Sequence, residues 1–466
     1  METLQRTANR GSVSTGYDID NSLKLEDDNQ EGLVRNYSGD GDRRTWTYST
    51  WIKRTEIGND YHYLVAANYN GIFFLSDNKL RIALYNGSTT YYANPERLFR
   101  DTSAWYHLVV ALDTTQGTAA DRVKVWVNGE AVTVWDQYTT YTNISQNDQM
   151  GFGLAAYNYQ IAYYFAGGGT DRRFNGYMAE THMCNGVAAD EQDFGEYDAD
   201  SGIWIPKEYT GSHGTKGFYL KFDNASNLGE DTAGNGSFSL TNITSADQAT
   251  DTPTNNFCTM NPLKGPLISF VNGTASNPRI PLMTEGATVL GNNANTYSYA
   301  EATMGVTSGK WYWEMKCTVD ANTNVSGAGI ATNINKGFYS TDGTGNFFWH
   351  MDGNRYVNGA STGYGAAWAT NDILGFAYDA DNWTLTCYKN NSSQGNVLAS
   401  QADLSAEIVI PYMYSYGTHT YQWNFGGYHA NSLSSAATDA NGYGSFEYAP
   451  PSGYYALCTK NLAEYG

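Results

Sequence analysis

The strongest candidate for chemistry in this sequence is a pair of carboxylates at alternating positions, Glu196 and Asp198, with Asp200 next in phase. Alternating residues of a strand share one face, and two carboxyl groups about 5–5.5 Å apart can cleave a glycosidic bond. The surrounding run EQDFGEYDAD, however, lacks the apolar alternation of a half-buried strand. A solvated acidic turn explains it better, so we do not expect hydrolysis at these residues.

The histidines do not form a recognisable catalytic motif either. The seven His are scattered, and the sequence contains no G-x-S-x-G elbow, H-E-x-x-H motif or G-x-x-x-x-G-K-[ST] loop. His107 lies inside an apolar run and is predicted to be a core or edge residue. The sequence therefore predicts a protein that is not an enzyme.

Metal sites and disulfides are not expected. The chain has five cysteines, an odd number without a C-x-x-C pair, which argues against a disulfide framework and a zinc site. Asp223, Asn224, Asn227, Asp231 and Asn235 are loosely spaced and fit an ordinary polar loop better than a calcium loop. We expect no cofactor, with Ca²⁺ left open as the alternative.

The charge of the chain excludes two classes of partner. The net charge is −20, and the halves before and after Cys258 are both acidic. Neither half offers the basic stripe that binds phosphate backbones or anionic lipids. No run of 18 apolar residues could span a bilayer, and the polar segment Met1 to Gly11 shows no secretory signal. We expect synthesis in a reducing cytoplasm, no nucleic acid as a partner and no membrane insertion.

The composition predicts an all-β chain with two domains. The 466 residues include 38 Tyr, 18 Phe, 12 Trp and 49 Gly, and long helical runs of Ala, Leu, Glu and Lys are absent. Aromatic residues suit pleated strands, and Gly supplies the turns between them. The length suits two β-sandwiches of about 200–250 residues each.

The clearest local prediction is a hairpin in the first half. Val123, Val125 and Val127 share one face of a strand, and Asn128-Gly129 supplies the two positive φ angles that a type I′ turn requires.

Five segments of the first half occur in an order that resembles a known family. They are Leu23-Lys24-Leu25, Trp46 to Lys53, Trp105 to Val109, Val123 to Gly129 and Phe174 to Glu180. Together they resemble the laminin-G/pentraxin-like members of the concanavalin A-like superfamily. The resemblance implies an antiparallel jelly-roll sandwich over residues 18–250, of a kind that often binds sugars. We interpret residues 1–17 as a docking arm.

A proline-punctuated segment, 251–284, separates the two halves near residue 258. Its Phe257-Cys258-Thr259 recurs near the end of the chain as Leu457-Cys458-Thr459, each followed by x-N. We interpret both segments as closing a module and leading out of it, with chance recurrence as the alternative.

The second half resembles a SPRY domain over residues 285–466. The residues that carry this resemblance are the strand Lys310 to Glu314, Gly329-Ile330-Ala331, Asp352 to Gly359, Tyr364 to Trp368, Asp372 to Asp379 and Thr384 to Asn390. The resemblance implies a bent β-sandwich that binds a protein or peptide through loops at one rim. Core packing is predicted for the strand aromatics, and loop positions for the ligand-binding candidates, which are Trp349, His350, Tyr356, Tyr364, Trp368 and Tyr421.

The pairing of these modules in an acidic chain resembles virion proteins of tailed bacteriophages, as do the segments DTPTNNFCTMNPL and PSGYYALCTKNL. The resemblance implies a homo-oligomeric tail fibre or adhesin that contacts other virion proteins and recognises a host-surface glycan or protein. Two alternatives stay open: a capsid-decorating or head-fibre protein, and a polysaccharide-depolymerising spike enzyme.

Overall fold

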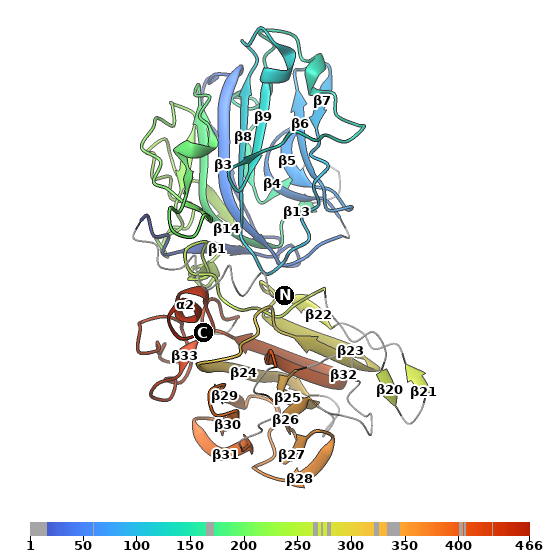
Figure 1. Ribbon diagram of the computed structural model, residues 1–466. Helices are drawn as coiled ribbons and strands as arrows, with labels where there is room; N and C mark the ends of the chain where they lie inside the picture. Colours follow the sequence, from blue (N-terminus) through green and yellow to red (C-terminus); the bar gives the residue numbers. More distant parts are fainter. Residues whose placement is uncertain are drawn as a thin grey trace. The chain divides into compact units, whose positions relative to one another are not determined.

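The computed structural model describes residues 16–58, 60–164, 172–263, 269–271, 274–276, 281–320, 326–332, 345–399, 404, 407–430 and 432–466. The described residues are nearly all in strands and their connections, which confirms the all-β prediction. The chain divides into two compact units, Ser14–Thr254 and Asn255–Gly466, here called the first and second domain and drawn in Figure 1.

Two antiparallel sheets form the first domain. Sheet A has the order β10-β9-β8-β3-β14-β1-β19, with β17 also on β14, and sheet B has the order β18-β2-β11-β4-β5-β6-β7. The strands of sheet A are β1 (Ser22–Leu25), β3 (Thr45–Arg54), β8 (Tyr106–Asp113), β9 (Val123–Val127), β10 (Glu130–Ala131), β14 (Gly176–Asn185), β17 (Phe218–Leu220) and β19 (Gln248–Ala249). Those of sheet B are β2 (Gly32–Arg35), β4 (His62–Ala67), β5 (Asn70–Phe74), β6 (Leu80–Tyr85), β7 (Thr90–Ala93), β11 (Tyr159–Ile161) and β18 (Ser239–Thr241).

Two short hairpins and four 3-10 helices complete the first domain as described. The hairpins pair β12 (Tyr163–Tyr164) with β13 (Arg172–Arg173) and β15 (Gly195–Tyr197) with β16 (Trp204–Pro206). The helices are Ala119–Asp121, Tyr141–Asn143, Glu191–Asp193 and Ser245–Asp247.

The predicted hairpin of the first domain is confirmed. Val123, Val125 and Val127 are all in the core that the two sheets enclose. Asn128 and Gly129 have φ angles of 50° and 77° at the turn, the pair of positive values that the sequence predicts for type I′. Figure 1 shows β8 between β9 and β3, as the strand order requires.

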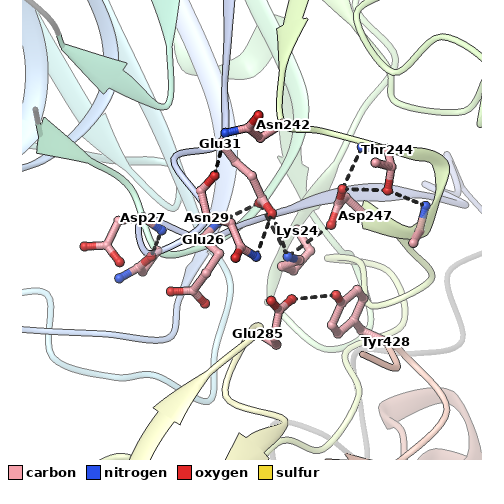
Figure 2. A network of polar contacts seen from close by, with 12 residues as sticks. Lys24, Glu26, Asp27, Asn29, Glu31, Asn242, Thr244, Asp247, Glu285 and Tyr428 are labelled. Atoms are coloured by element: carbon pink, nitrogen blue, oxygen red, sulfur yellow. Dashed lines mark hydrogen bonds and ion pairs between the residues drawn. The ribbon is translucent and has the colours of Figure 1, made fainter. Parts of the chain in front are cut away.

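Buried ion pairs connect early strands of the first domain to its last segment. Lys24 Nζ on β1 lies 3.1 Å from Glu31 Oε1 and 3.0 Å from Asp247 Oδ1 (Figure 2). Lys53 Nζ on β3 lies 2.7 Å from Asp251 Oδ2. Since Asp247 and Asp251 belong to the last segment of the domain, these contacts fasten that segment to strands formed near its beginning.

The second domain is built on an antiparallel sheet, in which β33 pairs with β24 in parallel. The strand order is β28-β27-β26-β25-β32-β24-β29-β30-β31; β23 pairs with β32 and β22, and β20 pairs with β21. Its strands are β20 (Ser269–Val271), β21 (Thr274–Ser276), β22 (Leu282–Thr284), β23 (Val289–Glu301), β24 (Lys310–Asp320), β25 (Ser326–Ala331), β26 (Asn346–His350), β27 (Asn354–Val357), β28 (Ala360–Gly363), β29 (Ile373–Asp379), β30 (Thr384–Lys389), β31 (Ser392–Leu398), β32 (Ile410–Asn424) and β33 (Tyr455–Ala456), followed by helix α2 (Thr459–Tyr465).

The two recurring cysteine segments pair with each other inside the second domain. Phe257 and Cys458 form an antiparallel bridge, and the backbone N–H of Cys258 donates to the carbonyl of Leu457 at 3.0 Å. The interpretation that each segment closes a different module is therefore wrong. Consecutive buried side chains of both segments pack on opposite sides, with Cys258 and Leu457 in one apolar cluster and Phe257 and Cys458 in another.

The five cysteines are free and buried. Among the described residues, no helix is long and apolar enough to cross a membrane.

Candidate functional site

The outer face of sheet B carries an aromatic cluster outside the main core. Phe73 and Ala83 lie on this face because their neighbours Ile72, Phe74, Ile82 and Leu84 point into the core. The rings of this aromatic face are Tyr61, Tyr63, Phe73, Tyr92 and Tyr164. Tyr61, Tyr92 and Tyr164 are only partly buried, so the face presents ring surface to solvent.

The rings lie in a nearly continuous row across several strands. Tyr63 stacks on Phe73 with centroids 4.1 Å apart and on Tyr164 at 4.9 Å, while Tyr61 lies 5.6 Å from Phe73. Gly71 makes room for this row, since a Cβ there would lie 2.7 Å from the Tyr63 ring. Stacked rings over small residues make a flat apolar platform, which suits a ligand with flat apolar faces of its own.

Two arginines lie over the rings of the aromatic face. The guanidinium carbon of Arg172 is 4.4 Å from the Tyr61 centroid, and that of Arg81 is 4.7 Å from the Tyr92 centroid. Asn94 Oδ1 accepts a hydrogen bond from Arg81 Nε at 3.2 Å. Within the described part of the chain, neither guanidinium has a carboxylate within ion-pair distance. The face therefore combines apolar platforms with cationic hydrogen-bond donors.

Four of the six residues predicted to bind a ligand from loops are buried. Trp349 and His350 lie in β26 and Tyr421 lies in β32, so the prediction of loop positions for these three is wrong. Trp368 lies on a loop but is only 2% exposed. The rings of Trp368 and Tyr421 contact each other, with centroids 6.3 Å apart. Both are buried because the removal of large apolar rings from water stabilises the fold.

The remaining two candidates are partly exposed. Tyr356 lies in β27 rather than in a loop, and its ring stacks on Phe348 with centroids 4.9 Å apart. Tyr364 follows β28, and its hydroxyl donates to the carbonyl of Gly395 on β31. A ligand could reach these two without repacking of the core.

The acidic run around Glu196 forms the hairpin of β15 and β16. Glu196 and Asp200 are exposed, and Asp198 accepts hydrogen bonds from the backbone and the hydroxyl of Ser201 at 2.7 and 2.6 Å. Exposure to solvent agrees with the prediction, but the prediction of a simple turn is wrong, because the run contains the 3-10 helix Glu191–Asp193 and strand β15.

A buried polar cluster on the outer face of sheet A was missed by the sequence reasoning. Glu180 accepts hydrogen bonds from the hydroxyls of Tyr17 at 3.0 Å and Tyr219 at 2.8 Å. His182 lies 3.6 Å from Glu180 through Nε2, and its Nδ1 is 3.1 Å from His213 Nε2. A bulge between Ala179 and His182 brings these groups together from segments far apart in sequence, which a strand pattern cannot reveal.

This cluster has acid and base groups but no room for a substrate. The depression that Glu180 and His182 line with Ser49 and His107 does not admit a water molecule. Burial and, to a smaller extent, the neighbouring His182 lower the pKa of His213 to about 4. The described geometry therefore indicates a structural network.

The hydrogen bond between the adjacent Ser49 and His107 has the wrong donor for nucleophilic catalysis. The indole N–H of Trp204 can only donate, and it lies 3.0 Å from His107 Nδ1, which must therefore accept. The ring proton is then on Nε2, 2.9 Å from Ser49 Oγ. Since a general base needs a free lone pair at that nitrogen, His107 cannot take the proton of Ser49.

Among the residues that the structure describes, one group of three carboxylates lies close enough together to bind a metal ion. Glu26, Asp27 and Asp28, in the turn after β1, bring three oxygen ligands within 4.8 Å of one another; Glu26 and Asp27 are labelled in Figure 2. Consecutive acidic residues in a turn commonly do so without an ion, and a calcium site needs six or more oxygens. Of the polar loop predicted from sequence, Asp231 is buried and paired with Arg35 at 2.9 Å.

Both domains match known family models. A model described as the concanavalin A-like lectin/glucanases superfamily matches residues 27–192, and the SPRY domain model matches residues 310–428. No curated protein matches the chain.

Several solved structures are similar to parts of the chain. The SPRY domain of human HERC1 is 19% identical, with a TM-score of 0.27, over 31% of this chain and 91% of that one. A candidate carbohydrate-binding protein from Bacteroides ovatus is 16% identical, with a TM-score of 0.36, over 48% of this chain and 58% of that one. The heptameric SAP-like pentraxin of Limulus polyphemus is 16% identical, with a TM-score of 0.26, over 36% and 77% of the two chains.

The family matches and the two all-β domains define the class of this protein: a concanavalin A-like/laminin-G-like domain followed by a SPRY domain. Both predicted resemblances are confirmed at this level. Domains of these two kinds fit a role in binding and recognition.

Proposed function

We propose that the chain is a non-enzymatic recognition protein of a tailed-bacteriophage virion, which binds a host-surface glycan through the aromatic face of its first domain. The observation that carries the binding part is the row of stacked rings with Tyr61, Tyr92 and Tyr164 open to solvent. Sugar rings have apolar C–H faces that stack on aromatic side chains, while ring hydroxyls accept hydrogen bonds from arginine.

The virion part of the proposal rests on the sequence resemblance alone. On this ground we propose a tail fibre or adhesin, assembled as a homo-oligomer with other virion proteins. Capsid decoration and a depolymerising spike enzyme are the alternatives. Tyr356 and Tyr364 are the corresponding candidates for a protein ligand of the second domain.

A glycan array and a whole-cell binding assay with the full chain test the proposal. We expect Tyr61→Ala combined with Tyr92→Ala to weaken binding at least about tenfold, since central aromatic contacts dominate such interfaces. Tyr138→Ala is the matched control, because Tyr138 is 61% exposed and lies outside the aromatic face. Thermal unfolding of each variant establishes that the fold is kept.

Three outcomes would contradict the proposal. Absence of binding to any glycan or host cell would remove the recognition role, and an undiminished affinity of the double variant would remove the aromatic face as its site. Release of reducing ends from host polysaccharide would establish the enzyme alternative. The array is repeated with EDTA, and we expect no loss of binding because no cofactor is part of the proposed site.

A further inference from the structure

We infer that the aromatic face selects acidic glycans, namely polymers whose sugars carry carboxylate groups. The inference rests on the proposed function and adds the class of ligand. It starts from Arg81 and Arg172, the two cations of the aromatic face.

The buried cations of the first domain are satisfied by protein groups, either by backbone carbonyls, as for Arg54 and Arg122, or by carboxylates. Lys24, Arg35 and Lys53 lie 2.7 to 3.1 Å from buried carboxylate oxygens. Arg81 and Arg172 differ, since among the described residues both are partly buried with rings and amide or hydroxyl groups as neighbours. In a chain with a net charge of −20, these two partly exposed guanidinium groups give the aromatic face a local positive charge.

The two guanidinium groups are spaced along one row of rings. Phe73 pairs directly with Arg81 across β5 and β6, so these side chains leave the sheet on the same face. Tyr61 contacts Phe73 and carries Arg172. The order across the face is therefore Arg172, Tyr61, Phe73, Arg81 and Tyr92, with a cation on each side of the Tyr61–Phe73 ring pair.

Stacking leaves the hydrogen-bonding edge of a guanidinium available. A cation–π contact uses the flat face of the group, whereas its N–H donors point outward in its plane. Arg81 gives its Nε–H to Asn94, which leaves the terminal nitrogens to donate. A carboxylate can accept two parallel hydrogen bonds from such an edge, and this charge-assisted pair is stronger than a bond to a neutral hydroxyl.

The chemistry of both components points to a carboxylated sugar polymer. The rings bind the apolar face of a sugar of either kind, but only an acidic sugar gives the guanidinium groups a counter-charge. The overall negative charge of the chain repels polyanions at long range, so the local arginines are needed for an acidic glycan to bind at all.

Paired polymers test the inference with the full chain. The probes are polygalacturonate, alginate, hyaluronate and polysialate, each beside its carboxyl-reduced, neutral derivative. We expect at least one acidic polymer to bind about tenfold or more tightly than its neutral derivative. Arg81→Gln and Arg172→Gln should each remove most of this preference and weaken binding of the neutral polymer far less, because glutamine keeps a hydrogen-bond donor but not the charge.

Two controls separate this inference from the proposed function. Tyr61→Ala should weaken binding of both forms of the polymer, because the ring serves sugars of either charge. Arg97→Gln should change neither, since Arg97 lies 3.8 Å from Glu130 and outside the row. A phosphorylated glycan is included, to show whether any anionic sugar suffices.

The possible outcomes are distinct. Equal binding of acidic and neutral polymers, or a preference that survives both arginine substitutions, overturns the inference and leaves the proposed function standing. A preference for phosphorylated over carboxylated polymers also overturns it. A folded protein that binds no glycan of the panel, the array or the host cell overturns both.

Discussion

The two domains are both built mainly of antiparallel strands, yet their buried carboxylates have different partners. The first domain fastens its last segment with Lys24 and Lys53, each buried against carboxylates. In the second domain, the buried carboxylate of Glu314 accepts hydrogen bonds from the backbone N–H groups of Glu447 and Tyr448, both at 2.9 Å, and is one of several buried carboxylates there.

Large apolar side chains fill the core of the second domain. Five tryptophans in it are at most 2% exposed: Trp311, Trp313, Trp349, Trp368 and Trp423. Both domains have an apolar core, and the first adds buried lysine–carboxylate pairs at its last segment, so the two should respond differently to mutation and pH.

The largest losses of stability are expected from removal of a buried charge partner in the first domain and of a buried ring in the second. Asp251→Ala leaves Lys53 buried without its carboxylate and should destabilise the first domain by about 3–5 kcal/mol. Trp313→Ala should cost the second domain about as much, through a cavity rather than a charge. Denaturant unfolding, with hydrogen exchange to assign each transition to a domain, measures both.

A double substitution distinguishes these two causes. Lys53→Met with Asp251→Leu removes both charges and should restore most of the stability lost in Asp251→Ala, since well-packed apolar pairs can replace a buried ion pair. If the double variant is as unstable as Asp251→Ala, the charge is not the reason for the loss.

Acidification should affect the two domains in opposite directions. Burial lowers the pKa of His62 and of His107 to about 3, so the folded imidazoles stay neutral while the unfolded ones bind protons below about pH 6.5. Stability of the first domain is therefore lost as the pH falls below 6.5, by about 2 kcal/mol at pH 5 for each of these two histidines. Glu31, whose pKa burial raises to about 7, opposes this loss only in part.

In the second domain, burial raises the pKa of Glu314 to about 7. The unfolded carboxyl ionises above about pH 4.5, so this group contributes stability at low pH that is lost as the pH rises toward 7. Thermal unfolding between pH 7.5 and 5 should show the first domain alone losing stability. His107→Gln should reduce its pH dependence, and an equal loss in both domains would contradict the assignment.

The smallest effect concerns the segment that closes each domain. Thr244 caps the 3-10 helix Ser245–Asp247 by accepting a hydrogen bond from Ala246 N, whereas Cys458 at the start of α2 makes no such side-chain bond. Thr244→Ala should cost the first domain about 1 kcal/mol, and Thr244→Ser should cost less because it keeps the hydroxyl. Equal losses in the two variants would show that the cap does not stabilise the domain.

Local signals account for what the sequence predicted correctly. The Asn128-Gly129 hairpin depends only on adjacent residues, and the strand Lys310 to Glu314 is long and alternating, so both were recognisable. Whether an aromatic residue faces the core depends on strands far away in sequence, which is why Trp349 and Tyr421 were placed on loops.

The aromatic face escaped sequence reasoning for a related reason. Its rings come from separate strands and from a hairpin beside β4. A register shift between Tyr63 and Val65 also interrupts the alternation that would reveal an outward-facing ring. Only the pairing of β4, β5 and β6 brings Tyr63, Phe73 and Arg81 together.

The bridge between Phe257 and Cys458 places the first and last segments of the second domain side by side. A domain with adjacent ends can be looped out of another chain or circularly permuted, because a short linker can join the ends without strain. The exposed turn at Gly359, between β27 and β28, offers a place for the new termini. The SPRY domain thus meets this geometric requirement for transfer between chains as a unit.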